Sequence, residues 1–450
     1  MTAAEDTAAP RGDGPPPPSP ARLLLTPGYL RLLLLSVLLG IPVALAAFFF
    51  VSLQHWLQHE IWTELPDAVG YTEAPWWWPL PALALAGLIL APIVTRFPGG
   101  GGHLPADGLG AGDPIGPREL PGVVLAALTV LPLGGVLGPE APLMAVGSAL
   151  ALLAVRRIKG AQNPQALGVV ATAGSTAAIS TILGGPIVAA ILLLEAAGLG
   201  GAQLVVLLLP CLAASASGAL VFTGFGQWTG LSIGGLSLPS VPPDANPDAG
   251  DFLWGIPLAV LIAAAVALAR RLGHGTGRWT ARDRTATRTV ACALAVGVCL
   301  SAYALITGRS PEEAALSGQA MLGELAAHPG AWSVGALFAL VACKGLAWAI
   351  SLGGLRGGPI FPALLIGAAA AVACAALPGL GPTPALALGM TAAGTAVMGL
   401  PLCSAVLTVL LLGKDAHDQM PLIVITAVTA HLTVTFLNQK TARPRTPRTD

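Results

Sequence analysis

The stretch that decides the fold is GPEAPLMAVGSALA (Gly138–Ala151), which recurs 220 residues later as GPIFPALLIGAAAA (Gly358–Ala371). Both copies read G-P-x-x-P-x-x-x-x-G-[SA]-A-x-A. Each is followed by a second apolar segment with a proline near its start, GGPIVAAILLLE (Gly184–Glu195) after the first copy and GLPLCSAVLTVLLL (Gly399–Leu412) after the second. Two pairs in the same order predict two homologous halves within one chain.

The composition around these motifs is that of a membrane protein. Of the 450 residues, 54% are hydrophobic and only 10% are charged, whereas soluble domains carry about 25% charged residues. A water-soluble enzyme or a nucleic-acid binder is therefore disfavoured. The equal numbers of acidic and basic residues also provide no basic field for a nucleic acid.

Long apolar stretches divide the chain into membrane segments. The first runs over 32–51, which is long enough to span a bilayer. Ten more follow at about 79–95, 122–155, 166–198, 202–222, 252–269, 289–307, 331–353, 359–379, 384–413 and 420–437. We expect an all-α polytopic membrane domain over 23–440, between a disordered tail at 1–22 and a basic tail at 441–450.

Charge placement orients these segments, because short cytoplasmic loops collect Lys and Arg. Basic residues mark three inside segments: Arg156, Arg157 and Lys159; Arg270, Arg271, Arg278, Arg282, Arg284 and Arg288; and Lys440, Arg443, Arg445 and Arg448. Acidic residues mark two outside segments, the loop 53–78 and the segment around Asp244, Asp248 and Asp251. We therefore expect a multi-pass protein of the plasma (inner) membrane with both termini cytoplasmic.

These orientations require some segments to be broken. Residues 122–155 begin and end inside, near Arg118 and Arg156, although they are long enough for more than one crossing. Several segments must therefore be half-length or re-entrant, interrupted at Gly and Pro. The first half, at about 30–225, then starts inside and ends outside, and the second, at about 250–440, does the reverse. This is an inverted-topology repeat, which is typical of many transporters and some channels.

The two Gly-Pro pairs are candidate anion-facing helix starts. Proline suits the first helical turn, and a helix N-terminus presents N–H groups and about half a positive charge to an anion. The alternative is that the pairs are packing kinks.

Glu140 directly follows the first Gly-Pro pair, and a carboxylate inside a membrane is a functional hypothesis by default. It could occupy the anion site as a tethered anion and leave when protonated; otherwise it is a neutral or helix-capping carboxylate.

Other polar residues carry weaker signals. Glu195 is either interfacial or a capping partner, and Lys344 should snorkel inward or pair with a carboxylate. His103 follows four glycines in a loop, where a loop or cap role is the simpler interpretation. The six cysteines lie in or beside apolar runs without CxxC spacing, which indicates small core residues and neither a zinc site nor a disulfide. We expect no metal and no cofactor.

At this point the motifs resemble those of the CLC family of chloride channels and chloride/proton antiporters. The family signatures G-S-G-I-P, G-[KR]-E-G-P and G-x-F-x-P are similar to G-G-H-L-P (Gly101–Pro105), G-P-E-A-P (Gly138–Pro142) and G-P-I-F-P (Gly358–Pro362). The resemblance covers about residues 30–440. It implies a homodimer with one anion pathway per subunit, and the chain's end at residue 450 predicts a divergent member without the cytosolic CBS pair.

The resemblance also implies a set of site residues. It places the gate on Glu140 and the anion-binding positions on Gly102, His103, Gly138, Glu140, Ala141, Gly358, Ile360 and Phe361. Gly102 stands where the family has its chloride-coordinating Ser. Pro139 and Pro359 lack the N–H groups that those positions usually offer, and no Tyr follows Tyr303 to supply the second hydroxyl. Ala196 stands at the internal proton-relay position, where antiporters of the family carry Glu.

The sequence therefore predicts chloride (anion) permeation through a CLC-like pore gated by Glu140, channel-like or uncoupled from protons. The alternatives are a chloride/proton antiporter and a secondary transporter of another small anion. An intramembrane enzyme is disfavoured, because no Ser/His, paired Asp or HExxH arrangement appears in the apolar runs. The expected partners are chloride or another small anion, the lipid bilayer and a second copy of the chain, with no nucleic acid.

Overall fold

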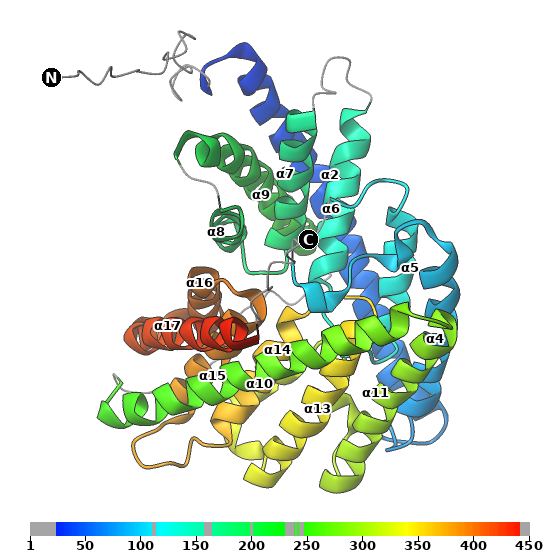
Figure 1. Ribbon diagram of the computed structural model, residues 1–450, viewed down its shortest axis with the longest axis vertical. Helices are drawn as coiled ribbons and strands as arrows, with labels where there is room; N and C mark the ends of the chain where they lie inside the picture. Colours follow the sequence, from blue (N-terminus) through cyan, green and yellow to red (C-terminus); the bar gives the residue numbers. More distant parts are fainter. Residues whose placement is uncertain are drawn as a thin grey trace, which may run out of the picture.

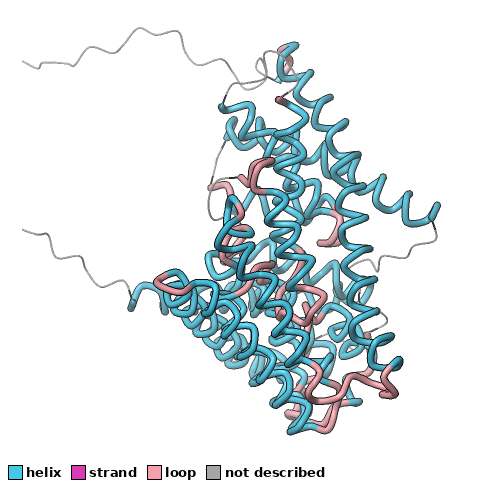
Figure 2. Tube along the Cα trace, turned by 90° about the vertical axis from the view of Figure 1, so that its right-hand side faces the viewer, coloured by secondary structure: helices cyan, strands magenta, loops and turns pink. Residues whose placement is uncertain are grey.

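A computed structural model describes residues 24–109, 114–156, 164–198, 201–229, 238, 241–242 and 247–441. The predicted tail at 1–22, most of the predicted tail at 441–450, and Arg157, Lys159 and Asp244 lie outside the described residues. Helices and connecting loops make up the described part of the chain, which contains no extended strand (Figure 2). The predicted all-α fold class is confirmed.

The helices follow one another in two series. The first comprises α2 (Pro27–His59), η1 (Glu60–Glu64), α3 (Leu65–Ala68), α4 (Pro79–Arg96), η2 (Pro98–Gly101), η3 (Pro105–Asp107), α5 (Leu120–Val130), α6 (Glu140–Val155), α7 (Pro164–Ser180), α8 (Pro186–Ala196) and α9 (Gly201–Thr229). The second comprises α10 (Ala249–Ala281), α11 (Thr285–Thr307), η4 (Pro311–Glu313), α12 (Gln319–Ala327), η5 (Pro329–Ala331), α13 (Val334–Gly354), α14 (Ile360–Val372), α15 (Pro382–Met398), α16 (Pro401–Leu412), η6 (Gly413–Asp415) and α17 (Ala416–Thr441).

Figure 1 shows α6, α7 and α9 in the upper part of the molecule and α10, α13, α15 and α17 in the lower part, with α8 against α16 where the two parts meet. Seven helices of the described chain are long and apolar enough to cross a membrane by length and composition. They are α2 with its extension, α4, α9, α10, α11, α13 and α17.

The remaining apolar helices are short because glycine and proline interrupt the longer stretches. The predicted stretch 122–155 contains α5 and α6, 166–198 contains α7 and α8, and 384–413 contains α15 and α16. The helices α8 and α16 each begin at a proline. The charge pattern predicted a break within 122–155, and α5 and α6 divide that stretch.

Two connecting segments differ from the sequence prediction. The expected outside loop 53–78 is helical as far as Ala68, because α2 continues through η1 into α3. The expected inside loop around Arg270–Arg288 is also largely helix, since α10 extends to Ala281 and α11 begins at Thr285. In neither case does a Gly-Pro pair follow the apolar run, and α10 continues even through Gly273, Gly275 and Gly277.

Each half contains a close helix crossing at which two glycines meet. A Cβ at Gly147 in α6 would overlap the carbonyl oxygen of Gly174 in α7, and a Cβ at Gly367 in α14 would overlap the carbonyl oxygen of Gly389 in α15. Gly147 and Gly367 occupy the same place in the repeated motif. Glycine at both crossings lets the backbones approach closely, as small residues do between membrane helices.

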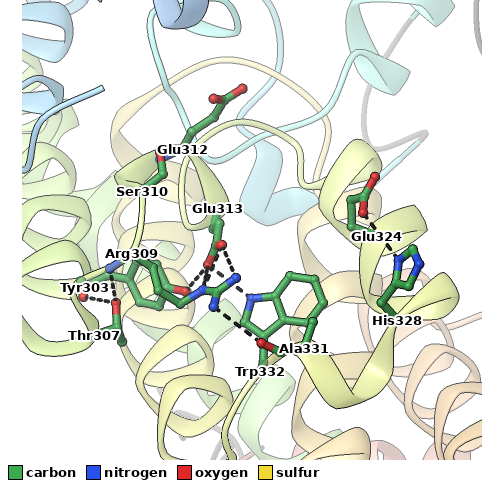
Figure 3. Close-up of polar contacts among 10 residues, drawn as sticks. All are labelled: Tyr303, Thr307, Arg309, Ser310, Glu312, Glu313, Glu324, His328, Ala331 and Trp332. Atoms are coloured by element: carbon green, nitrogen blue, oxygen red, sulfur yellow. Dashed lines mark hydrogen bonds and ion pairs between the residues drawn. The ribbon is translucent and has the colours of Figure 1, made fainter. Parts of the chain in front are cut away.

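A polar clamp fixes the loop that precedes α12. The Glu313 carboxylate accepts hydrogen bonds from the Tyr303 hydroxyl and from the Trp332 indole, the latter over 3.2 Å. Arg309 donates to both oxygens of Glu313 over 2.9 Å, and its guanidinium lies 5.0 Å from the centre of the Trp332 ring (Figure 3). The clamp therefore joins the end of α11 to the segment before α13.

Lys344 fixes the next residues of this loop from α13. Its side chain is fully buried, and Nζ donates to the carbonyl oxygens of Ala314 over 2.9 Å, Ala315 over 2.7 Å and Leu316 over 3.3 Å. The expectation that Lys344 snorkels or pairs with a carboxylate is wrong, because three backbone carbonyls satisfy the three donors of its ammonium group.

Candidate anion site where two half-helices meet

The two copies of the repeated motif meet through their glycines. The Gly138 N–H donates to the carbonyl oxygen of Gly358 over 2.8 Å, and the Gly358 N–H donates to that of Gly138 over 2.6 Å. Pro139 and Pro359 follow as the N-cap residues of α6 and α14. The starts of two half-helices from opposite halves of the chain are thus joined directly.

The Glu140 carboxylate lies at the N-terminus of α14. The residue is fully buried, and its Oε1 accepts a hydrogen bond from the Phe361 N–H over 2.9 Å. The N–H groups of Ile360 and of Glu140 itself are also close enough to interact with this carboxylate. Oε2 is buried and has no hydrogen-bond partner among the described residues. A carboxyl group therefore occupies a helix N-terminus that is suited to an anion.

Glycine is needed on both sides of this carboxylate. A Cβ added at Gly138 or at Gly358 would overlap the carboxylate oxygens of Glu140. The N–H group of each glycine donates to the carbonyl oxygen of the other, and a direct ligand role for Gly138 and Gly358 stays a prediction. Their contribution is the space that the carboxylate fills.

Gly102 and His103 lie in the loop between η2 and η3. Gly102 has a φ of 104°, in the region that favours glycine, so a serine would be strained there. His103 is exposed. Arg356 ties this loop to the second motif, because its Nε donates to the Gly100 carbonyl over 3.0 Å and its Nη1 to the Leu355 carbonyl over 3.0 Å.

Arg356 belongs to a small charged group. Asp107 interacts electrostatically with both Arg356 and Arg270, and Arg270 lies within 3.5 Å of the Ala106 carbonyl. This group therefore consists of two guanidinium groups and one carboxylate. The sequence analysis missed Arg356, although a charged residue two positions before the second motif was a visible signal.

A cavity of about 390 Å³ opens between this loop and helices α6, α7 and α8. Among the residues that line it are His103, Ala141, Ser148, Ser175, Thr176 and Ala196. The hydroxyls of Ser175 and Thr176 donate to backbone carbonyls over 2.9 and 2.7 Å, so they present oxygen acceptors to the cavity. At about 30 Å³ per water molecule, the cavity has room for on the order of ten.

The neighbouring residues Glu195 and Ala196 lie in different parts of the protein. Glu195 caps α16, because Oε1 accepts from the Leu402 N–H over 3.0 Å and Oε2 from the Cys403 N–H over 2.8 Å. The capping alternative for Glu195 is therefore the correct one. Ala196 lines the cavity instead. The adjacent positions on α8 face different parts of the protein, as successive helical residues do.

The structure thus brings the predicted site residues into two groups. The first group is the Glu140 carboxylate where α6 and α14 begin, together with its neighbours Gly138, Gly358, Ile360 and Phe361. His103, Ala141 and Ala196 line the adjoining cavity. All six cysteines are free; Cys211, Cys292 and Cys403 are buried, and the other three are partly exposed.

Comparison with known proteins identifies the family. Residues 106–435 match the family described as voltage gated chloride channel, and the chain belongs to this family. The chain is 31% identical over 172 residues to the YfeO proteins of Escherichia coli strain SMS-3-5 / SECEC and strain O7:K1 IAI39 / ExPEC, which are named as candidate ion-transport proteins. This match spans 38% of the chain and 40% of each relative.

Solved structures share the fold at low sequence identity. A slow cyanobacterial Cl⁻/H⁺ antiporter has a TM-score of 0.74 and 16% identity, over 91% of this chain and 95% of the antiporter. A CLC-type fluoride/proton antiporter has a TM-score of 0.71 and 17% identity, over 90% of this chain and 96% of that protein. The CLC architecture predicted from the motifs is therefore confirmed.

Proposed function

We propose that this protein conducts chloride or another small anion across the membrane, with Glu140 as the gate. The observation that carries the proposal is the buried Glu140 carboxylate on the Phe361 N–H, at the joined starts of α6 and α14. Family membership supports an anion as the transported species. The protein works in a lipid bilayer, as a homodimer in the plasma (inner) membrane with both termini cytoplasmic.

In this proposal the carboxylate and the permeating anion compete for one site. While Glu140 is charged, it holds the N–H groups of the first turn of α14 and excludes an anion. Protonation removes the negative charge, weakens the hydrogen bond to Phe361 and lets the side chain leave. An arriving anion then binds the N–H groups of Ile360 and Phe361, and the N–H groups of Glu140 and Ala141 act from the opposite helix start. Neutralisation of Glu140 therefore opens the pathway.

Proton coupling requires more than the gate. A proton that reaches Glu140 from the other side of the membrane needs titratable groups or water along its route, and Ala196 provides no titratable group at the relay position. We therefore expect passive, uncoupled movement. Liposomes with an outward chloride gradient should release chloride with little uphill proton uptake, recorded with chloride and pH electrodes together. Repeating the assay with fluoride and nitrate identifies the preferred anion.

The second candidate function is chloride/proton antiport, and one observation favours it. The cavity lined by Ala141 and Ala196 reaches from beside the gate to the relay position and presents hydroxyl oxygens to water. A chain of water molecules there could replace the missing carboxylate. Proton uptake at a fixed ratio to chloride efflux would make this the correct function and contradict uncoupled transport.

Arg356 supplies the fixed positive charge of the pathway in this proposal. The predicted site lacks the serine hydroxyl at Gly102 and two N–H donors at Pro139 and Pro359. Arg356 lies between the loop of Gly102 and the second motif, and Asp107 balances only one of the two nearby arginines. A guanidinium that is held by two backbone carbonyls offers its remaining positive charge to an anion without first having to be ordered.

Replacing Arg356 with glutamine should weaken chloride binding by about tenfold, because the change removes a positive charge that two backbone carbonyls hold just before the second motif. Calorimetry measures the affinity. Arg356→Lys keeps the charge and should retain most of the binding. Arg271→Gln removes an exposed charge on α10 and should bind as the wild type. Unchanged affinity in Arg356→Gln would remove Arg356 from the pathway.

A further inference from the structure

A long apolar groove lies between α10, α13 and α14, away from the anion site. Its volume is about 530 Å³, and its lining is almost entirely hydrocarbon. Leu258, Leu261, Ala265, Leu268 and Leu272 form one wall along α10 at helical spacings of three and four. Small residues on α13 leave the space open: at Gly345, which lines the groove, an added Cβ would have no atom within 4 Å.

We propose that this groove binds one acyl chain of an anionic phospholipid, with the headgroup at the C-terminal end of α10. The wall from Leu258 to Leu272 extends for about 21 Å at a rise of about 1.5 Å per residue. One leaflet takes about half of a hydrocarbon core of about 30 Å, so the groove is long enough for a whole chain. A hydrocarbon chain also fits a lining that offers few polar partners.

The charge that selects the headgroup lies on the continuation of the same wall. The exposed ring of Trp279 lies on α10, seven residues or two helical turns after Leu272. The Arg288 guanidinium lies 5.0 Å from the centre of this ring, and its Nη1 donates to the Trp279 carbonyl over 2.5 Å. Tryptophan is typical of the membrane interface, and an arginine held there is suited to a phosphate group.

The surrounding charges favour an anionic over a zwitterionic lipid. Arg278 in the last turn of α10, and Arg282 and Arg284 between α10 and α11, lie close to Trp279 and Arg288 in sequence. The segment's one carboxylate is Asp283. This basic end is also the one that the charge pattern assigns to the cytoplasmic side. The inference does not depend on which anion the protein conducts, because none of these residues belongs to the anion site.

The test compares two phenylalanine variants on the same helix. Gly345→Phe fills the groove, whereas Gly335→Phe places the same side chain on α13 outside the groove, at an exposed position that also has no atom within 4 Å of an added Cβ. Each protein is equilibrated in vesicles of phosphatidylglycerol and phosphatidylcholine in equal parts. Retained lipid is then counted by native mass spectrometry.

The wild type and Gly335→Phe should retain phosphatidylglycerol in preference to phosphatidylcholine. Gly345→Phe should retain it about tenfold less, since the loss of burial of two CH₂ groups is enough for that factor. Arg288→Gln should keep the bound lipid but lose the preference for phosphatidylglycerol. Far-UV circular dichroism and size-exclusion profiles like those of the wild type show that each variant is folded.

Three results would overturn the proposal. Wild-type lipid retention in Gly345→Phe would mean that the lipid binds elsewhere. Equal retention of the two lipids by the wild type would remove the role of Arg288. A shift of Gly345→Phe from dimer to monomer, with retained lipid unchanged, would make the groove a contact between two copies of the chain. Chloride flux recorded on the same samples keeps a failure of lipid binding distinct from a failure of anion transport.

Discussion

Replacing Glu140 with glutamine is expected to make chloride flux nearly independent of external pH. In the wild type the charged carboxylate holds the Phe361 N–H over 2.9 Å inside a fully buried site, so flux should rise as the pH falls and the carboxylate takes up a proton. Glutamine is neutral at every pH and should leave the pathway open throughout. Chloride efflux from liposomes at a series of external pH values measures the effect.

Glu195→Gln is the matched control for this experiment. Glu195 is also a carboxylate on the N-terminus of a short helix, where it accepts from Leu402 and Cys403. Its replacement should leave the pH profile of the flux unchanged, because it lies outside the joined starts of α6 and α14. A wild-type pH profile in Glu140→Gln would make Glu140 structural and place the gate elsewhere.

Replacing Lys344 with methionine is expected to destabilise the protein by at least about 3 kcal/mol. The change leaves the carbonyl oxygens of Ala314, Ala315 and Leu316 without their donor, and each buried unsatisfied group costs about 1–3 kcal/mol. In a chain of this size that corresponds to a fall in unfolding temperature on the order of 4 °C. Thermal unfolding in detergent, followed by tryptophan fluorescence, measures it.

Lys344→Arg keeps a cation at the same place and serves as the control. It should lose less stability than Lys344→Met, because a guanidinium can still donate to backbone carbonyls. The loop held by Lys344 packs on α14, where a Cβ at Gly318 would overlap the Leu365 side chain. Equal unfolding temperatures for the wild type and Lys344→Met would mean that the three hydrogen bonds contribute nothing to stability.

The architecture could be predicted from the sequence because its defining motif occurs twice. The repeated Gly-Pro motifs at Gly138 and Gly358 place two interrupted helices in matching halves, and the structure joins those two glycines by a pair of hydrogen bonds. The charge pattern further predicted broken segments, and α5 to α8 are short because glycine and proline interrupt the apolar stretches there. A motif that recurs at a fixed offset carries information about tertiary pairing that a single copy does not.

The parts that could not be predicted depend on partners far away in the sequence. Lys344 lies in an apolar run of the sequence, but the three carbonyls that it binds belong to an irregular loop without a sequence signature. Arg356 reaches Gly100 across 256 positions. The choice between capping and interfacial roles for Glu195 likewise depended on where α16 begins. Helix ends such as Ala68 were missed because polar residues can extend a helix beyond its membrane-spanning part.

The central claim is that the Glu140 carboxylate occupies a site that a permeating anion takes when the carboxylate leaves. The most direct test is anomalous scattering from crystals of Glu140→Ala grown with bromide. The account predicts a bromide ion within hydrogen-bond distance of the Phe361 N–H, where the carboxylate oxygen lies in the wild type. No ion at this helix start, with bromide bound elsewhere along the chain, would contradict it.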